Sequence, residues 1–304
     1  MSGVKIAFVA DVYGRVQYDR YLLFKKILAD YRIDFFSIKN KRQIKKLRNN
    51  SKKYNIIYLA SATNYERLRI SHPKIISSIT SWKILSMDKR KMKKIIKKPY
   101  AISVNNLGLY KELKHIRSDI VYLPNCVDTK VFCPDKKKKS HNPIVLGWTG
   151  NVDREEKNYK RLLKPVMKKL KGDVSFNLIK TKKGNKGSHY KSKSDMNLYY
   201  NSLDYYLNVS SSEGTPNPCL EAASCGIPLI STSVGNMPEL IKHRVNGFFV
   251  KNKINSVIDG IRMAVEVSEA KYEEMSQLIR NDIEKGWSIK SREKAILDFF
   301  NKVL

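Results

Sequence analysis

The sequence predicts an α/β protein built from two domains of similar architecture. Short apolar runs alternate with amphipathic segments from the start of the chain, a pattern typical of parallel strands joined by crossover helices. The chain has 304 residues, enough for two compact domains that each bury an apolar core. A polar segment with four consecutive lysines, residues 126–143, interrupts the alternation, which then restarts. We therefore expect domains at residues 1–125 and 144–285, with 126–143 as the linker.

The first domain is expected to hold six strands with helices between them. Short apolar runs mark the strands, and Tyr18–Tyr31 is the clearest helical stretch. The expected strands are Lys5–Ala10, Ile33–Ile38, Ile56–Ala60, Lys74–Ile79, Tyr100–Val104 and Ile120–Leu123. This order of elements describes one Rossmann-like unit.

The second domain repeats the architecture with five strands. A helix is expected from Asn158 to Leu170, and further helices fill most of the chain after the last strand. The expected strands are Ile144–Trp148, Val174–Ile179, Tyr205–Val209, Pro228–Thr232 and Phe248–Val250. Residues 286–304 are expected to form a terminal helix that packs back toward the first domain.

Charge is the most unusual global property. The net charge is +31; residues 1–140 hold 33 Lys and Arg against 10 Asp and Glu, or +23, and residues 141–304 hold 26 against 18, or +8. Such a field favours anionic partners such as a lipid surface, a phosphate-bearing acceptor or nucleic acid. The alternative is a merely solvated basic surface.

The composition also bounds location and metal chemistry. The chain lacks a run of about 20 apolar residues that would span a bilayer, and its start lacks the features of a secretory signal. We therefore expect a cytoplasmic protein. The four cysteines lack the paired spacing of a zinc site, so we expect them to be reduced and structural, with no metal and no cofactor bound.

Residues 205–250 indicate where a ligand would bind. A strand ends at Val209, a loop follows, and Asn217 and Pro218 suit the cap and first position of a helix. Ligands of open α/β sheets bind outside the carboxyl ends of the strands, where helix N-termini offer free amides to phosphate. Gly235 and Asn236 form a second turn within reach of the same edge.

Two carboxylates, Glu213 on the loop and Glu221 in the first turns of the helix, stand near this edge. Carboxylates beside a phosphate are favourable where they accept hydrogen bonds from hydroxyl groups, and sugar and ribose supply such hydroxyls. The alternative is that Glu213 is a solvated loop residue and Glu221 complements the helix dipole. Spacing alone leaves the two interpretations even.

At these residues the chain resembles a known family. The run Glu213-Gly-Thr-Pro-Asn-Pro-Cys-Leu-Glu221, followed by Val234-Gly235 and Pro238-Glu239-Leu240, resembles the donor-site signature of retaining glycosyltransferase family 4, the group 1 glycosyl transferases. Pro124–Pro134 resembles the interdomain segment of that family, and Gly147-Trp-Thr-Gly150 the turn that opens its second domain. The resemblance covers residues 120–304 well and the first 120 in general pattern.

The resemblance implies a GT-B fold, in which two Rossmann-like domains face each other across a cleft. It also implies that the protein transfers a sugar from a nucleotide-sugar, a UDP- or GDP-sugar. The transfer would retain the anomeric configuration and would need no metal. By position, Glu213 would contact the sugar hydroxyls and Glu221 the ribose hydroxyls. Other implied contacts to the donor come from Gly214, Thr215, Pro216, Asn217, Gly150 and Asn151.

Three positions depart from the family pattern. The family places a Lys and an Arg on the diphosphate; Lys157 fits the Lys, whereas Asn151 stands at the Arg position and Arg154 could reach in instead. A His of many relatives is replaced by Thr80 or Ser81. The first loop keeps one glycine, Gly14. The sequence names no catalytic base.

Residues 88–98 predict a basic amphipathic helix. Seven basic residues lie between Lys89 and Lys98, with Met92, Ile95 and Ile96 at helical spacing. Such a helix can lie on an anionic membrane, which favours a glycan or lipid-linked acceptor at the inner membrane face. The alternative is an ordinary helix that packs one apolar edge.

Two rival functions stay open at this point. A catalytically degenerate GT-B protein that serves as a binding or scaffold subunit fits the departures at Asn151 and Thr80. A nucleic-acid-binding protein fits the charge, but no recognition motif accompanies that charge, so nucleic acid is not the expected partner.

Overall fold

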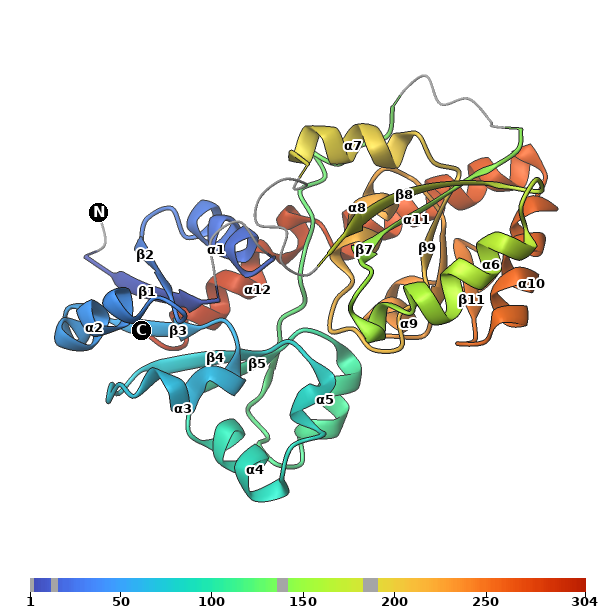
Figure 1. Cartoon of the computed structure of the whole chain (residues 1–304). Coiled ribbons are helices and arrows are strands. Elements are labelled where there is room, and N and C mark those ends of the chain that lie inside the picture. Colours follow the sequence, from blue (N-terminus) through green and yellow to red (C-terminus); the bar gives the residue numbers. More distant parts are fainter. Residues whose placement is uncertain (1–2, 12–15, 136–141, 183–190) are drawn as a thin grey trace. The chain divides into compact units, whose positions relative to one another are not determined.

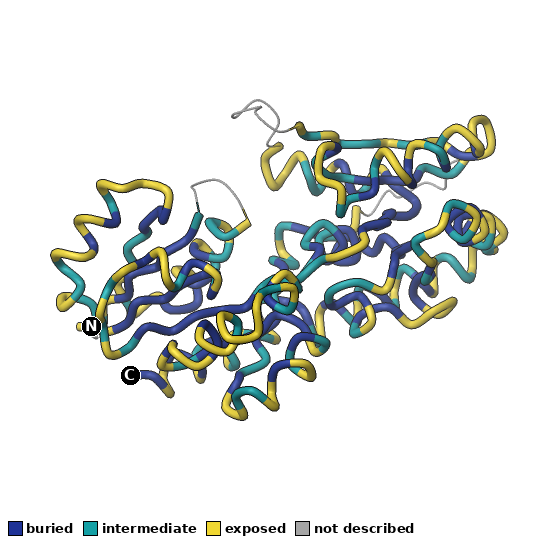
Figure 2. Tube along the Cα trace, turned by 60° about the horizontal axis from the view of Figure 1, so that its bottom comes forward, coloured by how far each residue is buried: buried dark blue, intermediate teal, exposed yellow. Residues whose placement is uncertain are grey.

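A computed structural model describes residues 3–11, 16–135, 142–182 and 191–304. The chain divides into two compact units, Met1–Asn125 with Glu293–Leu304, and Cys126–Arg292. We call these the first and the second unit and describe each by itself. Figure 2 shows that the strands form the buried centre of each unit and that the helices expose their outer sides.

The first unit is built on a parallel sheet of six strands. Their order across the sheet is β2-β1-β3-β4-β5-β6, and every pairing is parallel. Parallel sheets covered on both faces have strands that are apolar nearly throughout, and all four residues of β3 are buried. The strands are β1 Lys5–Ala10, β2 Arg32–Ser37, β3 Ile56–Leu59, β4 Ile75–Ile79, β5 Ala101–Val104 and β6 Val121–Tyr122.

Helices cover both faces of this sheet (Figure 1). One face carries an aromatic cluster in which Phe8 meets Phe24 at 5.9 Å between ring centroids, and Phe24 meets Phe300 of the terminal helix at 5.4 Å. The α-helices of this unit are α1 Val16–Ile27, α2 Lys41–Asn49, α3 Tyr65–Leu68, α4 Lys89–Lys97, α5 Leu107–Leu113 and most of α12 Ile289–Asn301; short 3₁₀ turns are η1 Ser51–Lys53, η2 Ala62–Asn64 and η3 Trp82–Ile84.

The second unit is built on a parallel sheet of five strands in the order β11-β10-β9-β7-β8. Because β9 lies between β10 and β7, the loops after these three strands meet at one edge. The strands are β7 Val145–Asn151, β8 Ser175–Thr181, β9 Tyr205–Asn208, β10 Leu229–Thr232 and β11 Gly247–Val250.

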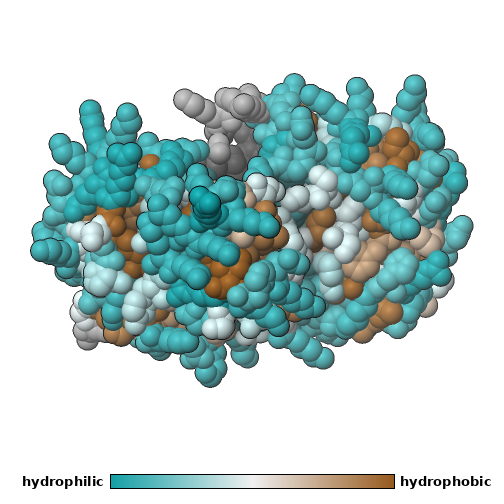
Figure 3. Space-filling view, turned by 90° about the horizontal axis from the view of Figure 1, so that it is seen from below, coloured by the Kyte–Doolittle hydropathy of each residue, from teal (hydrophilic) through white to brown (hydrophobic). Residues whose placement is uncertain are grey.

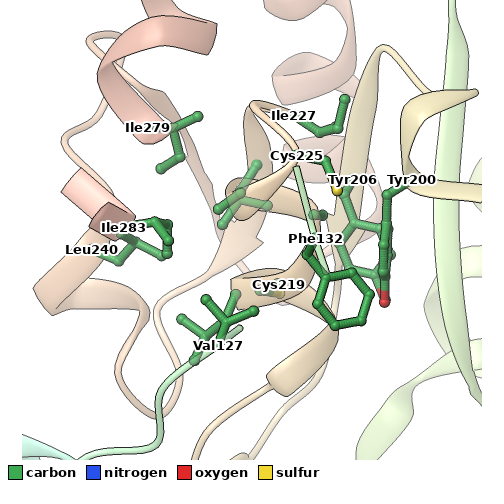
Figure 4. Packing of buried hydrophobic residues seen from close by; sticks show 14 of the residues in the cluster. Val127, Phe132, Tyr200, Tyr206, Cys219, Cys225, Ile227, Leu240, Ile279 and Ile283 are labelled. Atoms are coloured by element: carbon green, nitrogen blue, oxygen red, sulfur yellow. The ribbon is translucent and has the colours of Figure 1, made fainter. Parts of the chain in front are cut away.

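The helices of the second unit bury two clusters of apolar side chains against the sheet. Figure 4 shows part of the first cluster, in which Val127 and Phe132 of the segment before β7 pack with side chains that include Cys219, Ile279 and Ile283. The helices are η4 Glu155–Lys157, η5 Tyr159–Leu163, α6 Lys164–Lys169, α7 Lys193–Asn201, α8 Asn217–Ser224, α9 Met237–Leu240, α10 Ile254–Val265 and α11 Glu269–Gly286.

All eleven expected strands are confirmed, most with ends within one residue of the prediction. The expected helix at Asn158–Leu170 begins with a π-helical turn, η5, before α6 continues it. Pro165 cannot donate a backbone hydrogen bond to the residue four positions earlier, and the wider turn stands just before it. The expected cap was wrong: Pro216, not Asn217, occupies the cap position of α8.

Candidate functional site

The loop after β9 is held at its base by buried hydroxyl groups. Ser210 is fully buried, and its backbone carbonyl accepts a hydrogen bond of 2.7 Å from the Thr232 hydroxyl at the end of β10. The Ser210 hydroxyl in turn donates to Oε1 of Glu213 at 2.9 Å. The carboxylate of Glu213 is therefore oriented from within the loop that carries it.

Lys157 and Glu213 form an ion pair at this edge. Lys157 Nζ lies 2.7 Å from Glu213 Oε1, and the two side chains expose only 14% and 12% of their surface. Lys157 ends η4, which follows β7, so the pair joins the loops after two neighbouring strands. The backbone N–H of Ser211 also donates to the Glu156 carbonyl at 2.8 Å. An ion pair and a backbone hydrogen bond thus connect the two loops.

Glu221 lies on α8 and is oriented by a tyrosine from another helix. The Tyr200 hydroxyl of α7 donates a hydrogen bond of 2.6 Å to Glu221 Oε2. Tyr200 is fully buried, and this burial raises its pKa well above the ordinary value. The phenol therefore keeps its proton at any physiological pH and acts as a donor to the carboxylate.

The turn after β10 touches the Glu213 loop. Gly235 has φ +57°, and a Cβ atom at this position would lie 2.6 Å from the carbonyl oxygen of Gly214. Only glycine allows both this backbone conformation and this approach. The next residue, Asn236, is fully buried, and within the described part of the chain its carboxamide has no hydrogen-bond partner.

Arg154 and Asn151 lie beside the site, and their side chains have partners of their own. Arg154 binds Glu156 at 2.7 Å and exposes 52% of its side chain. Asn151, the last residue of β7, accepts a hydrogen bond of 2.8 Å from the backbone N–H of Asp153. The guanidinium of Arg154 is therefore engaged by Glu156, whereas Lys157 is the cation that meets Glu213.

The remaining predicted residues frame the same edge, with one exception. Gly214, Thr215 and Pro216 form the end of the loop, and Asn217 begins α8. Gly150 lies in β7, where a Cβ atom would stand 2.7 Å from the Trp148 ring. Gly14 lies outside the described residues.

Cys219, near the site, is unsuited to act as a nucleophile. All four cysteines are free, and Cys219 on α8 is buried. Burial raises the pKa of its thiol far above the ordinary range, so the reactive thiolate is not populated at neutral pH. Among the described residues, no three His, Cys, Asp or Glu side chains gather as metal ligands would.

The arrangement therefore combines carboxylate acceptors with the Lys157 cation. Glu213 and Glu221 offer carboxylate oxygens to hydroxyl groups, and Lys157 offers positive charge. The first N–H groups of α8 are bound to carbonyls of the loop before it. A ligand with several hydroxyl groups and a phosphate would match these side chains. Residues 134–282 match the family model described as Glycosyl transferases group 1. This part of the chain is similar to the group 1 glycosyl transferases.

The matched region contains Lys157, Glu213 and Glu221, so the predicted family resemblance is confirmed where those residues lie. A curated relative, an uncharacterized glycosyltransferase of Haemophilus influenzae, is 30% identical over 88 residues, which are 28% of this chain and 25% of that protein. The chain thus spans about a quarter of the length of that relative.

Solved glycosyltransferase structures share the fold of the whole chain. HepE of Anabaena, crystallised with UDP and glucose, aligns with a TM-score of 0.76 and 12% identity over 98% of this chain and 100% of that one. A glycosyltransferase of Rickettsia africae aligns with a TM-score of 0.75 and 15% identity over 100% and 99%. The predicted GT-B type of fold, with two Rossmann-like domains, is confirmed by these likenesses.

The sequence did not reveal the partner of Glu221. Tyr200 lies on α7, which follows a stretch rich in Lys, Gly and Ser and is not among the helices expected above. The signal that could have found the helix is Ser192 followed three residues later by Asp195, since the two side chains form a capping box.

Proposed function

We propose that this protein is a retaining glycosyltransferase that moves a sugar from a UDP- or GDP-sugar to a glycan, lipid-linked or phosphate-bearing acceptor. The observation that carries the proposal is the Lys157–Glu213 pair inside the matched domain. It sets a cation and a carboxylate side by side at the carboxyl ends of neighbouring strands, where ligands of open α/β sheets bind.

Each side chain has a role in the proposal. Lys157 binds the diphosphate of the donor, Glu213 accepts hydrogen bonds from sugar hydroxyls, and Glu221 accepts them from the ribose. Gly214 and Thr215 bring backbone amides close to the sugar and diphosphate. The close approach of Gly235 to Gly214 supports this, because it fixes the loop that carries Glu213.

The charge that develops on the departing nucleotide needs stabilisation, and Lys157 is the first candidate to supply it. In the structure this cation is paired with Glu213, so a bound donor would share Lys157 with the carboxylate. Arg154 would add a second cation if it left Glu156. With this charge supplied by side chains, we propose transfer without a metal, in which the departing phosphate oxygen takes the acceptor proton and positioning provides most of the rate.

The acceptor is proposed to bind through the first unit, with an anionic membrane surface as a partner. Ile95 and Ile96 of α4 are buried in the core of that unit, whereas Lys93 and Lys97 are exposed. The apolar edge of α4 is therefore unavailable to lipid, and the attraction we propose is electrostatic. Figure 3 views the side on which α4 lies and shows mostly hydrophilic side chains. No helix among the described residues is long and apolar enough to span a membrane.

The experiment that tests the donor site is a thermal unfolding panel with UDP-, GDP- and ADP-sugars. Ligands that bind the native state raise the melting temperature by linkage, and HepE, crystallised with UDP, makes UDP-sugars the first choice. We expect one nucleotide class to stabilise the protein and Glu221→Ala to abolish that shift. No shift with any nucleotide-sugar would refute the proposal.

A second candidate is a catalytically inactive relative that binds the donor without transferring it. The pairing of Arg154 with Glu156 favours this candidate, since it holds the second cation away from Glu213. Slow hydrolysis of a stabilising nucleotide-sugar separates the two: release of free sugar above the buffer rate identifies an enzyme, and binding without release identifies the inactive relative.

A further inference from the structure

The hydroxyl of Tyr200 lies at the carboxylate of Glu221, and no family motif given above includes this tyrosine. We propose that Tyr200 is a positioning residue that fixes the Glu221 carboxylate for the vicinal ribose hydroxyls of the donor nucleotide, and that it thereby sets the preference for ribose over deoxyribose. The inference rests on the proposed function, because it assigns Glu221 to the ribose.

The first step is the contact itself. The Tyr200 hydroxyl donates to Glu221 Oε2 at 2.6 Å, the short distance of a charge-assisted hydrogen bond. A glutamate side chain on a helix has three torsions that would otherwise let its carboxylate move. With Oε2 bound to a buried donor, the plane and direction of the carboxylate are fixed before any ligand arrives.

The second step is the rigidity of the tyrosine. Its ring lies 6.0 Å from that of Phe132, 5.7 Å from Tyr206 and 5.3 Å from Tyr199, between centroids. Figure 4 shows Tyr200 beside Tyr206 and Phe132 within the apolar cluster. A ring packed on several sides by aromatic rings in edge-on geometry has little freedom to turn. The hydroxyl is therefore a fixed point from which Glu221 is held.

The hydroxyl of Tyr200 stays protonated, so it can act as a donor. Burial, with the negative charge of Glu221 as a further cause, raises the pKa of Tyr200 well above 10. The phenol donates to the carboxylate throughout the neutral range and cannot repel it as a phenolate would. A carboxylate has about four lone-pair sites, so the bond from Tyr200 is compatible with further bonds from ribose hydroxyls.

The competing explanation is that Tyr200 is only a core residue whose hydroxyl found a partner. The two explanations differ in one measurable respect. If Tyr200 positions Glu221, its removal must weaken the recognition of a ribose hydroxyl specifically. If Tyr200 only supports the core, its removal should weaken the binding of all nucleotides to the same extent, or should lower only the stability of the protein.

The test measures Kd by calorimetry for UDP, 2′-deoxy-UDP and 3′-deoxy-UDP, or for the guanosine analogues if the thermal panel selects GDP. The proteins are the wild type, Tyr200→Phe and, as a matched control, Tyr205→Phe. Tyr205 is also buried and would also lose one hydroxyl bond, of 3.1 Å to the Ala264 carbonyl; it belongs to the second apolar cluster, whereas Tyr200 belongs to the first. Both variants keep the aromatic ring.

We expect the wild type to bind the weaker of the two deoxy analogues about ten-fold less tightly than UDP. Tyr200→Phe should bind UDP about ten-fold less tightly than the wild type, and its discrimination against that analogue should fall below about three-fold. Tyr205→Phe should keep the discrimination of the wild type. A Tyr200→Phe protein that binds all three nucleotides with the wild-type ratio overturns the inference.

A second variant guards against a folding defect in Tyr200→Phe. Because the two side chains act on one hydroxyl contact, the double variant Tyr200→Phe/Glu221→Gln should bind UDP no more weakly than Glu221→Gln alone. Additive losses would overturn the inference. If the wild type binds no nucleotide, the proposed function fails and the inference with it; if it binds and discriminates but Tyr200→Phe discriminates equally, only the inference fails.

Discussion

The carboxyl-terminal edges of the two sheets use their polar side chains differently. In the second unit, ionised side chains at this edge are held by other side chains, Glu213 by Lys157 and Ser210, and Glu221 by Tyr200. In the first unit, the described side chains at the same edge include Ser81, which accepts from the N–H of Lys83, and Asn106, which caps α5. Oriented charge is what a phosphate and sugar site needs, so these held carboxylates support the proposed donor site in the second unit.

The ion pairs of the two units make the contrast quantitative. Lys157–Glu213 and Lys294–Asp298 of α12 have similar distances, 2.7 and 2.6 Å, but the first pair exposes 14% and 12% of its side chains and the second 87% and 59%. Exposed pairs contribute about 0–1 kcal/mol, because water and salt screen them. The same distance therefore has different consequences, and substitution at each pair is the most direct way to sharpen the comparison.

The largest effect is expected from Lys157→Ala. This change removes the cation proposed to bind the diphosphate and leaves Glu213 without its partner, so we expect kcat/KM for sugar transfer to fall about 10²- to 10³-fold. Lys294→Ala removes a pair of equal length at the surface and should leave kcat/KM within about two-fold of the wild type. The measurement is steady-state transfer, or donor hydrolysis where no acceptor is at hand. Equal kcat/KM values for the two variants would mean that the Lys157–Glu213 pair has no special role in sugar transfer.

The next effect is on stability and concerns the turn that approaches the Glu213 loop. Gly235→Ala adds a Cβ atom 2.6 Å from the Gly214 carbonyl oxygen at φ +57°, so we expect a loss of roughly 2–4 kcal/mol from backbone strain and overpacking. Gly172 provides the control, because it has φ +98° and open space around its Cβ position. Gly172→Ala should cost about 1 kcal/mol, from strain alone.

Denaturant unfolding of the two alanine variants measures the difference directly. Gly235→Ala should also weaken the stabilisation by a nucleotide-sugar, since the displaced loop carries Glu213. If Gly235→Ala loses no more unfolding free energy than Gly172→Ala, the turn at Gly235 is not in tight contact with the loop at Gly214.

The sequence predicted the strands well because their signal is local. β9 and β10 are short apolar runs bounded by polar turns, and burial on both faces of a parallel sheet requires that pattern. Glu213 and Lys157 were found through the family resemblance. Their ion pair could not be read from the chain, because they are 56 positions apart in the numbering and meet only when β7 and β9 pair.

The parts that the sequence missed depend on tertiary contacts. α7 has a weak apolar pattern because Tyr199 and Tyr200 bury aromatic rings that also carry hydroxyls. Arg154 was expected as a candidate for the diphosphate, and Glu156 two residues later competes for its guanidinium. Such a choice between partners is decided by backbone geometry, which the residue types alone do not specify.

A smaller effect is expected from the basic surface of the first unit. Lys93→Gln/Lys97→Gln removes two exposed charges from α4, each worth about 1 kcal/mol near an anionic bilayer. We expect binding to vesicles of phosphatidylglycerol and phosphatidylcholine to weaken about thirty-fold at low salt. The control, Lys168→Gln/Lys169→Gln, removes two exposed charges from α6 of the second unit.

Cosedimentation with the vesicles at several salt concentrations checks this prediction, because an electrostatic attraction must weaken as salt rises. The α6 variant should bind nearly as the wild type does. Equal losses for both pairs would mean that net charge, and not the position of α4, determines the binding.

The smallest effect is expected at an ion pair of the first unit with favourable geometry and much exposure. Arg117 binds both carboxylate oxygens of Asp119, at 2.7 and 3.0 Å, and this hydrogen bonding lowers the pKa of Asp119 below its usual value of 3.8. The Asp119 side chain is 53% exposed, so its contribution to stability should stay below about 1 kcal/mol.

Because the pKa of Asp119 is lower in the folded protein, its contribution is fully present above the unfolded-state value of 3.8 and is lost as the pH falls through the folded-state value. Unfolding free energies of the wild type and Asp119→Asn should differ by less than about 1 kcal/mol at pH 7 and converge once the pH lies below the folded-state pKa of Asp119. A gap that persists in acid would come from the hydrogen-bonding geometry around Arg117, which also donates to the carbonyls of Ile96 and Tyr100. A gap above about 2 kcal/mol at pH 7 would mean that exposure does not separate the ion pairs of the two units.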